Sequence, residues 1–478
     1  MRAETSTYRY QAVERRIMDL VESGGLALGD RLPSLRRMSR DLGLSVSTVH
    51  QAYVELEHKG VVESRPRSGF FVRRRATRLP RTETPPAPMS EPRPVTRIGL
   101  IQTVLESVGR EDAVPLAVIA PGEELLPLAE MGKITAAVVR DNPRRAMGYA
   151  PIPGDPELIR QVAFRSMECG IPVGPEDPVI TAGCMEALYL ALRATCRRGN
   201  TVLIQSPTYY CFLQLLETLG LRAIEIPSDP EGGVDPADLA HALRTFDISA
   251  CVLSPNFNNP DSSLTPDEAK REIVSLLAAR GIPLVEDDVS TDLHFTPKRP
   301  GTYKQFDEKG LVLLCSSFSK TISPGFRVGW CLPGRFRQKV LEIKATTNVC
   351  TSAPAQMAIA EYLRQGRMGR HLKRLRASME QQMDTMQLHL EQCFPPTTRV
   401  THPRGGGVLW LELDPRVDGV ELFFRARAES IAIAPGAIFS TRDKFSNYIR
   451  LSCGEPVTER IQRGIARLGV MAAEMAGA

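Results

Sequence analysis

The sequence contains no apolar run that approaches the length of about 18 residues needed to cross a bilayer. Its first residues also lack the apolar core of a secretory signal peptide. All ten cysteines lie at or after Cys169, and there is neither a C-x-x-C pair nor a cysteine and histidine cluster at zinc spacing. These absences argue against a membrane, exported or zinc-stabilised protein. We therefore expect a cytoplasmic protein with free thiols, no membrane partner and no metal site.

The length and the charge distribution indicate more than one domain. At 478 residues the chain exceeds the size at which a single hydrophobic core stops growing, so two or three domains are expected. Residues 1–97 hold 18 Lys and Arg against 11 Asp and Glu, whereas the whole chain has a net charge of only +5. The positive surplus thus belongs to the N-terminal part, as expected if that part binds a polyanion.

Three amphipathic helices are predicted near the N-terminus, at residues 10–22, 35–42 and 45–56. Ser34 can cap the second helix, and either Ser45 or Ser47 can cap the third. The second helix, a short turn with Gly43 and the third helix form the helix-turn-helix pattern. Two β-prone runs around a basic turn follow at residues 61–72 and indicate a winged hairpin.

This stretch resembles the GntR family of bacterial regulators over residues 8–73, through G-D-x-L-P-S-x-R at residues 29–36 and G-F-x-V at residues 69–72. The resemblance implies a winged helix-turn-helix domain, bounded at residues 1–75, that binds double-stranded DNA. Its third helix would enter the major groove, Arg36 and Arg37 would contact phosphates, and Arg65 and Arg67 would lie in the wing. The residues predicted to contact DNA are Arg36, Arg37, Ser45, Ser47, Thr48, His50, Gln51, Arg65, Arg67 and Gly69.

Residues 76–111 are predicted to form a linker. Between Arg73 and Arg97, six prolines are interspersed with seven arginines. Such a composition cannot bury enough apolar surface to fold, so a semi-extended segment is expected. Its arginines are expected to be solvated, although they could add phosphate contacts.

Beyond residue 111, short apolar runs alternate with helical stretches. The predicted strands lie at residues 179–181, 201–205, 250–254, 283–285 and 311–314. This alternation is typical of a mostly parallel sheet in an α/β domain. Helical segments at 355–388, followed by strands at 408–413 and 448–452, indicate a smaller α+β part at the C-terminus.

A lysine flanked by hydroxyl groups is the most specific chemical signal. The segment is Ser316-Ser317-Phe318-Ser319-Lys320, and Arg327 follows seven residues later. The lysine can form a Schiff base with an aldehyde while the serines and the arginine hold a phosphate, and pyridoxal 5'-phosphate (PLP) requires both. After the predicted strand at 179–181, Gly183-Cys184-Met185 begins a helix whose free N–H groups offer a further phosphate site.

Four more positions could complete a PLP site. Asp287, at the end of a predicted strand, could keep a pyridinium nitrogen protonated, and Asp288 is the alternative. Asn259 could hydrogen-bond the phenolic oxygen of the ring, and Tyr209 could stack on the ring. Arg450 could hold a carboxylate in a bidentate geometry that lysine cannot reproduce. Each residue alone could equally belong to a solvated loop, a turn or the core.

These residues, in this order, resemble those of fold-type I aminotransferases over residues 112–474. The resemblance implies an α/β fold with a PLP-binding domain at 112–478. Its large subdomain would cover about residues 140–350, and its small subdomain about residues 351–478.

The resemblance assigns the Schiff base to Lys320, the pyridinium contact to Asp287, the ring-oxygen contact to Asn259, ring stacking to Tyr209, and the substrate carboxylate to Arg450. Phosphate contacts fall to Gly183, Cys184, Met185, Ser317, Ser319 and Arg327. Tyr149 would reach the phosphate in a neighbouring subunit, so a homodimer is implied. Two positions depart from the family pattern: Ser290 replaces a tyrosine, and Ser262 replaces the glycine of N-P-x-G.

A GntR-like domain joined to an aminotransferase-like domain resembles the MocR subgroup of transcription regulators. The resemblance implies that the large domain binds PLP and senses an amine or amino acid. Such a ligand would shift DNA binding through its different affinity for two arrangements of the dimer. We therefore predict a PLP-dependent regulator, with residual half-transamination rather than a physiological enzymatic role. The alternative is an active aminotransferase with an accessory DNA-binding domain.

Overall fold

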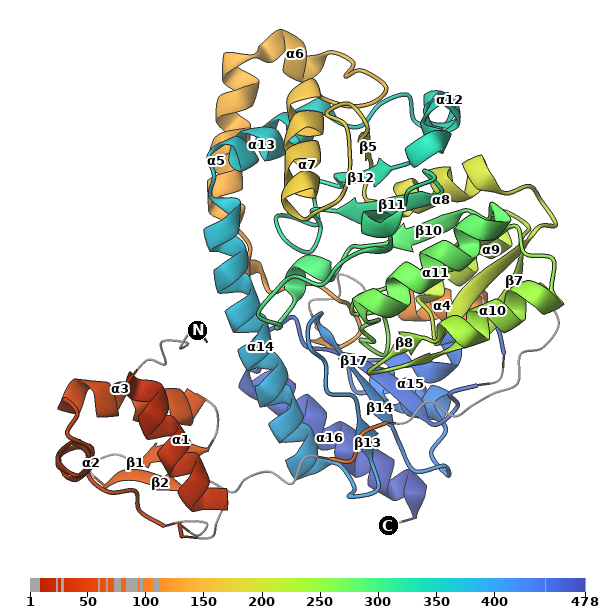
Figure 1. Ribbon diagram of the computed structural model, residues 1–478. Coiled ribbons are helices and arrows are strands. Elements are labelled where there is room, and N and C mark those ends of the chain that lie inside the picture. The colour runs from red at the N-terminus through yellow and green to blue at the C-terminus, as the bar shows by residue number, and fades with distance from the viewer. Residues whose placement is uncertain are drawn as a thin grey trace, which may run out of the picture. The chain divides into compact units, whose positions relative to one another are not determined.

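Two compact units make up the structure, which is a computed structural model (Figure 1). It describes residues 9–22, 25–26, 30–58, 61–65, 68–72, 79–82, 93–94, 98–106, 112–442 and 444–477. One unit ends at Arg78 and also includes residues 384–392, and the other contains the remainder from Leu79 onwards. Within these described ranges no helix is long and apolar enough to span a membrane, and no three His, Cys, Asp or Glu side chains form a group that could hold a metal ion.

The N-terminal unit consists of α1 (Arg9–Glu22), α2 (Leu35–Leu42), α3 (Val46–His58), β1 (Val62–Arg65) and β2 (Gly69–Val72). All five elements bury apolar side chains in one core, including Val13, Ile17, Met38, Val49, Tyr53, Leu56, Val62 and Val72. Ser34 caps α2, because its hydroxyl accepts a hydrogen bond from the Arg37 N–H at 3.3 Å. Gly43 ends α2 in the left-handed region, with φ of 62°. The predicted helix-turn-helix is confirmed.

The cap of α3 and the wing complete this unit. Ser45 is the cap, since its hydroxyl accepts from the Thr48 N–H at 3.1 Å. The hairpin β1–β2 is antiparallel, and residues 30–32 lie along its other edge. There the Leu32 N–H donates to the Phe70 carbonyl, and the Val72 N–H donates to the Asp30 carbonyl, both at 2.8 Å. The second strand of the predicted wing, β2, is therefore paired on both of its edges.

The second unit is built around a nine-stranded sheet with the order β3-β7-β6-β9-β10-β11-β12-β5, and β8 pairs with β7. Its strands are β3 (Arg93–Pro94), β5 (Val179–Thr181), β6 (Thr201–Ser206), β7 (Arg222–Asp229), β8 (Gly233–Val234), β9 (Ala250–Leu253), β10 (Leu284–Asp287), β11 (Val312–Ser317) and β12 (Gly329–Leu332). Pairs from β7 to β11 are parallel, whereas β12 is antiparallel to both neighbours. The predicted, mostly parallel sheet is confirmed.

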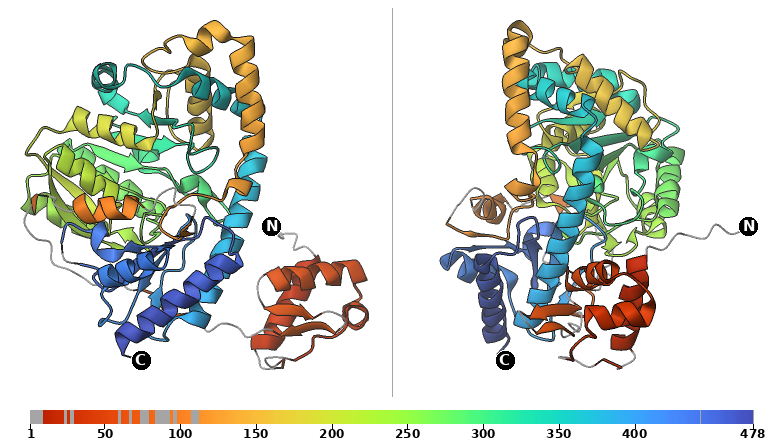
Figure 2. Two further views of the ribbon diagram at one scale, coloured as in Figure 1. Left: turned by 180° about the vertical axis from the view of Figure 1, so that it is seen from behind. Right: turned by 90° about the vertical axis from the view of Figure 1, so that its left-hand side faces the viewer.

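Helices cover both faces of this sheet (Figures 1 and 2). The helices in this part of the chain are α5 (Leu128–Asp141), α6 (Pro143–Met147), α7 (Pro156–Glu168), α8 (Cys184–Thr195), α9 (Tyr210–Thr218), α10 (Pro236–Thr245), α11 (Asp267–Arg280), α12 (Arg337–Thr347), α13 (Ala353–Arg364) and α14 (Met368–Cys393), with short 3-10 turns η1 (Glu123–Leu125), η2 (Thr291–Leu293), η3 (Tyr303–Phe306) and η4 (Gly334–Phe336). Val202 and Ile204 of β6 pack toward α8 and α9, whereas Leu203 packs toward α10 and α11. Successive side chains of a strand point to opposite faces, so a strand covered on both faces is apolar at every position.

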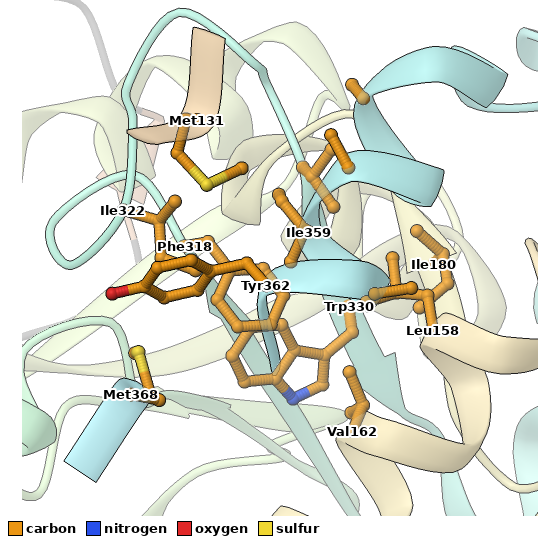
Figure 3. Packing of buried hydrophobic residues seen from close by; sticks show 14 of the residues in the cluster. Met131, Leu158, Val162, Ile180, Phe318, Ile322, Trp330, Ile359, Tyr362 and Met368 are labelled. Carbon is orange, nitrogen blue, oxygen red and sulfur yellow. The ribbon is translucent and has the colours of Figure 1, made fainter. Parts of the chain in front are cut away.

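A separate apolar cluster lies beneath the lysine-bearing turn (Figure 3). Phe318, the second residue before Lys320, packs against Trp330 of β12 with ring centroids 4.6 Å apart. Side chains from α5, α7 and α13 complete the cluster, among them Met131, Leu158 and Tyr362. The turn is therefore anchored by large buried side chains.

The small subdomain has its own sheet, with the order β13-β14-β17-β16 and antiparallel pairing throughout. Its elements are β13 (Arg399–Val400), β14 (Val408–Glu412), α15 (Gly419–Ala428), β15 (Ile431–Ala432), β16 (Ala434–Pro435), η5 (Gly436–Phe439), β17 (Tyr448–Ser452) and α16 (Glu459–Ala476). β15 pairs in parallel with β4 (Val114–Pro115), which precedes the large subdomain in the chain. The chain entering from the N-terminal side is thus bound to the small subdomain.

The structure differs from the prediction within the expected linker. α4 (Ile98–Leu105) is a helix, and its Ile101 and Val104 are almost fully buried. Residues 93–94 form β3 and add to the edge of the large sheet. The proline and arginine composition that suggested a linker stops at Arg97, and the next eight residues carry apolar side chains three residues apart, a spacing that favours a helix.

Candidate functional site

Lys320 lies on the turn between β11 and β12. The backbone of Phe318 closes the turn, because its N–H donates to the Val328 carbonyl at 3.0 Å. The Lys320 Nζ donates a hydrogen bond to the carbonyl of Ile119. Burial lowers the pKa of Lys320 to about 8, and the charges of Arg450 and Arg327 contribute to this lowering. A lysine with such a pKa is partly neutral near physiological pH and can act as a nucleophile.

The residues predicted to hold a phosphate lie together at the N-terminus of α8. Arg327 Nη1 donates to the Ser319 hydroxyl at 3.3 Å, and the Ser319 N–H donates to the Ser317 hydroxyl at 3.4 Å. Gly183, the N-cap of α8, has φ of 84°. A Cβ at Gly183 would lie 2.5 Å from Arg327 Nη2, so any other residue here would require the guanidinium to shift.

The first turn of α8 adds to these residues, and the whole group is called the phosphate cradle here. Cys184 and Met185 begin the helix, and no side chain caps it at Gly183. The first N–H groups of a helix lack intrahelical partners, and the helix dipole favours an anion there. Together with the Arg327 guanidinium, these groups suit a phosphate.

Of the two adjacent carboxylates, Asp287 faces the site. Its Oδ1 accepts hydrogen bonds from the Cys184 thiol at 3.4 Å and from the Val289 N–H at 3.2 Å. Asp288 instead forms an ion pair with Arg299 at 3.0 Å. Burial raises the pKa of Asp287 to about 6. Of Asp287 and Asp288, therefore, only Asp288 has an arginine partner among the described residues.

Arg450 is the most buried cation of the site, with 1% of its surface exposed. Its Nη1 donates to Asn259 Oδ1 at 3.3 Å, and its Nη2 donates to the Ala117 carbonyl. Its Nε has no hydrogen-bond partner in the described part of the chain, and the guanidinium carbon lies 5.6 Å from the centroid of the Phe439 ring. Burial lowers the pKa of Arg450. Among the described residues no carboxylate pairs with it, so this buried charge lacks an anion.

Asn259 lies in a turn whose fourth residue, Ser262, has a left-handed backbone. Ser262 replaces the glycine of N-P-x-G, and its φ of 57° lies in the left-handed region. Its hydroxyl donates to the Val408 carbonyl at 3.1 Å, and its N–H donates to the Asn258 carbonyl at 2.6 Å. These bonds hold a conformation that costs a non-glycine residue about 1 kcal/mol or more.

Tyr209 is the N-cap of α9, and its ring contacts Tyr210 and Phe212 at centroid distances of 4.8 Å and 5.5 Å. Burial raises the pKa of Tyr209 well above its usual value. Tyr149 lies in the loop after α6, and 91% of its surface is exposed. Ser290 is partly buried and directly precedes η2.

In the N-terminal unit, the predicted DNA contacts lie on exposed parts of α2, α3 and the wing. The exposed or half-exposed ones are Arg36, Arg37, Ser45, Ser47, Thr48, His50, Gln51 and Gly69. The hydroxyl of Ser45 is engaged with those of Ser47 and Thr48, each at 2.8 Å. Arg65 lies in β1, while its side chain and the whole of Arg67 fall outside the described residues.

Both parts of the chain match known protein families. Residues 9–72 match the bacterial regulatory proteins of the gntR family, and residues 127–468 match aminotransferase class I and II. The chain belongs to the class I and II aminotransferase family. Its N-terminal domain is of the GntR type.

Relatives of both kinds align with the chain. An uncharacterized HTH-type transcriptional regulator, YjiR, of Escherichia coli strain K12 is 35% identical over 96% of this chain and 98% of its own length. The 2-aminoadipate transaminase of Thermus thermophilus is 31% identical over 77% of this chain and 92% of its own. The crystal structure of LysN, the alpha-aminoadipate aminotransferase of that organism, complexed with N-(5'-phosphopyridoxyl)-L-leucine, superposes with a TM-score of 0.73 at 29% identity, covering 79% of this chain and 95% of LysN.

These matches confirm the predicted fusion of a GntR-type domain with a fold-type I aminotransferase domain. The residues of this class I and II aminotransferase domain also fit PLP. Lys320 offers an amine of lowered pKa, and Asp287 offers a carboxylate outside any arginine pair. Gly183 leaves room for Arg327 at the helix N-terminus, where a dianion would gain donors and a positive charge.

Sequence reasoning missed three groups at this aminotransferase-like site. The Cys211 thiol lies near Lys320, Asp287 and Arg450, and burial raises its pKa to about 11. The carbonyls of Ala117 and Ile119 accept from the two cations. A backbone carbonyl has no side-chain signature, so nothing in the sequence could have indicated these two contacts.

Proposed function

We propose that the protein is a PLP-dependent transcription regulator of the MocR type that acts as a homodimer. Its aminotransferase domain would bind PLP at Lys320 and respond to a small amine or amino acid. Its N-terminal domain would bind double-stranded DNA. The observation that carries this proposal is the buried Arg450, which has no carboxylate partner among the described residues and shares a site with Lys320 in a chain with a GntR-type domain. A buried cation without an anion is unfavourable, so a ligand carboxylate would complete the site.

The chain's own residues would divide the work at this site. PLP, when bound, supplies an electron sink. Lys320 would hold its aldehyde carbon, and the ionised Asp287 would keep its ring nitrogen protonated. Asn259, joined to Arg450 at 3.3 Å, would donate to the ring oxygen, and Tyr209 would lie against the ring. The phosphate would be held by Gly183, Cys184, Met185, Ser317, Ser319 and Arg327.

Two observations favour a regulator over an enzyme. The relatives named as HTH-type transcriptional regulators align over nearly the whole chain, whereas the 2-aminoadipate transaminase aligns over 77% of it. Ser290 stands where the family usually has a tyrosine. A serine side chain is too short to replace the tyrosine phenol beside the ring oxygen. An active aminotransferase remains the second candidate, because Lys320, Asp287 and Arg450 are all present.

The proposed dimer rests on Tyr149. With 91% of its surface exposed, this side chain is available to a second subunit, and the neighbouring Met147 is 71% exposed. Exposed aromatic and methionine side chains are enriched where proteins associate. Sedimentation of the wild-type protein and Tyr149→Ala, each with and without PLP, tests this. A monomeric wild-type protein would contradict the dimer.

The regulator is tested by selecting duplexes from a random DNA pool with the full chain. The affinity for the selected duplex is then measured without ligand, with PLP, and with PLP plus each of a panel of amines and amino acids. We expect a change in affinity with at least one combination. Arg36→Ala should weaken binding to all duplexes, whereas Gln51→Ala should also change the preferred sequence. Steady transamination without sequence-specific DNA binding would favour the enzyme instead.

A further inference from the structure

One backbone segment contacts both cations of the site. Residues 112–122, called the strap here, include β4 and end directly before η1. The Ala117 carbonyl accepts from Arg450 Nη2, and the Ile119 carbonyl accepts from Lys320 Nζ. The two groups proposed to bind a ligand carboxylate and the PLP aldehyde are therefore both engaged by the strap. No side chain of the strap is needed for either contact.

The strap is bound to the small subdomain by backbone hydrogen bonds on both sides of these carbonyls. The Val114 N–H donates to the Ser430 carbonyl, and the Ser452 N–H donates to the Leu116 carbonyl, each at 2.8 Å. At its far end the Gly122 N–H donates to the Gly454 carbonyl at 2.8 Å. The strap thus has a defined position that its own contacts maintain.

Two glycines show how closely the strap is packed. A Cβ at Gly454 would lie 1.7 Å from the Ala120 carbonyl oxygen, which is a backbone atom and cannot move without moving the strap. A Cβ at Gly464 of α16 would lie 3.0 Å from Cγ1 of Val114, a side-chain atom. An alanine at the first position therefore requires the strap to shift, and one at the second requires a smaller adjustment.

We propose that the strap is a latch that holds Lys320 and Arg450 in the ligand-free protein and is displaced in two steps, first by PLP at Lys320 and then by a ligand carboxylate at Arg450. This inference rests on the proposed function and names its regulation. A carboxylate forms charge-assisted, bidentate hydrogen bonds with a guanidinium that are roughly twice as strong as those of a neutral carbonyl. The second step therefore requires an amino acid, and an amine without a carboxylate leaves the Ala117 contact in place.

The strap is also placed to pass the signal on. It is the first described segment after α4 and residue 106, on the chain that joins the DNA-binding unit to the aminotransferase domain. The chain from the DNA-binding unit reaches the second unit at residues 79–82, where the Val400 N–H of β13 donates to the Pro80 carbonyl at 2.9 Å. The strap is bound to β17 of the same sheet, so a change in its position can reach this tether through the sheet. The two states, latched and displaced, have different affinities for the ligand, which is what coupling between two sites requires.

Hydrogen exchange on the full-length protein tests the displacement. The probes are PLP, N-(5'-phosphopyridoxyl)-L-leucine, and the matched adduct of 3-methylbutylamine, which has the same carbon skeleton without the carboxylate. Exchange of amides within residues 112–122 is expected to rise slightly with PLP and the amine adduct, and roughly fivefold or more with the leucine adduct, the lower end of typical coupling. Equal effects of the two adducts, or greater protection of the strap with the leucine adduct, would overturn the latch.

Glycine variants test the link to DNA without a ligand. Gly454→Ala should reproduce the ligand-bound DNA affinity in the absence of PLP, and Gly464→Ala should do so in part. Gly132→Ala, at an exposed position of α5 with nothing within 4 Å, is the matched control and should leave DNA affinity unchanged. Val114→Ala in the Gly464→Ala background should restore the latched state, because it removes the atom that the new Cβ meets.

The outcomes separate the latch from the proposed function. If PLP and the amino acid panel leave the DNA affinity of the wild-type protein unchanged, the proposed regulator fails, while hydrogen exchange still decides whether the strap is displaced. If the wild-type DNA affinity responds but Gly454→Ala behaves like Gly132→Ala in a folded protein, the latch fails and the regulator stands. Thermal unfolding of each variant establishes that it is folded, and Gly464→Ala replaces Gly454→Ala if that variant is not.

Discussion

The Cys184 thiol donates a hydrogen bond to the Asp287 carboxylate across 3.4 Å, which joins the first residue of α8 to the last residue of β10. Burial raises the pKa of Asp287 to about 6 from its usual 3.8. The ligand-free site therefore holds a carboxylate that is costly to ionise. A protonated pyridinium would remove that cost, because an opposite charge nearby favours the ionised form.

Asp287→Asn is expected to stabilise the PLP-free protein near pH 7.5 and to weaken PLP binding. The folded-state pKa of about 6 lies above the usual 3.8. Between these two pH values the folded wild-type protein binds more protons than the unfolded protein, so the stability of the wild-type protein falls as pH rises from 3.8 to about 6. A difference of two pKa units corresponds to at most about 3 kcal/mol. Urea unfolding should show the gain at about pH 7.5, and the gain should vanish near pH 4.

Asp288→Asn is the matched control for this prediction. Burial raises the pKa of Asp288 as well, but the ion pair with Arg299 at 3.0 Å offsets part of this rise. Asp288→Asn also leaves Arg299 with a single carboxylate partner, Asp292 at 3.1 Å, so we expect Asp288→Asn to be less stable at pH 7.5 than Asp287→Asn. A PLP-free Asp287→Asn protein that is no more stable than Asp288→Asn would show that the Asp287 charge is already compensated.

Gly183→Ala is expected to reduce PLP affinity at least tenfold, because the new Cβ would lie 2.5 Å from Arg327 Nη2 and push the guanidinium away. Gly199→Ala is a close control. Gly199 has a similar φ of 86° but nothing within 4 Å of its Cβ among the described residues, so both variants place a side chain at positive φ. Only Gly183→Ala also disturbs the phosphate cradle. Equal PLP dissociation constants for the two variants, measured by fluorescence titration, would rule out the steric explanation.

Local sequence patterns predicted the elements that carry the site. The strand at residues 179–181 was placed correctly, and Ser34 caps its helix as expected, because both depend on nearby side chains. The choice between Asp287 and Asp288 needed the structure, since it depends on Arg299, a residue eleven positions away from Asp288.

Other features depend on backbone atoms that meet only in the folded chain. The carbonyls of Ala117 and Ile119 reach residues more than 200 positions away, and any residue type supplies a carbonyl. Ser262 adopts a glycine-like φ because its N–H and hydroxyl find partners in the fold. Composition also hid α4, since the proline-rich stretch before it dominated the prediction for residues 76–111.

Glu225→Gln is expected to destabilise the protein by about 3 kcal/mol near neutral pH. Glu225 of β7 accepts from the Ser440 hydroxyl at 2.9 Å, the Thr441 hydroxyl at 2.8 Å and Lys444 at 3.4 Å, which joins the two subdomains. Burial alone would raise the pKa of Glu225, but Lys444 and these hydrogen bonds outweigh it and the pKa is lowered.

This lowered pKa fixes the sign of the pH dependence. The stabilising effect of Glu225 is present above its unfolded pKa of 4.5 and is lost as pH falls through the lower folded value. The difference between Glu225→Gln and the wild-type protein in urea unfolding should therefore shrink in acid. Glu308→Gln, at an exposed position, should have no comparable effect at any pH. A pH-independent loss in Glu225→Gln would mean that packing, not charge, holds the subdomains together.

Burial and the charge of Arg450 both lower the pKa of Lys320, and this predicts how the rate of covalent PLP capture depends on pH. Only the neutral amine can attack the aldehyde, so the rate should rise about tenfold per pH unit and level off above about pH 8. Arg450→Met removes the charge and should move this plateau to higher pH, whereas Arg280→Met, at an exposed position of α11, should not. Borohydride reduction followed by mass spectrometry measures the pyridoxyl group on Lys320 at each pH. A plateau that stays near pH 8 in Arg450→Met would show that burial alone sets the reactivity of this lysine.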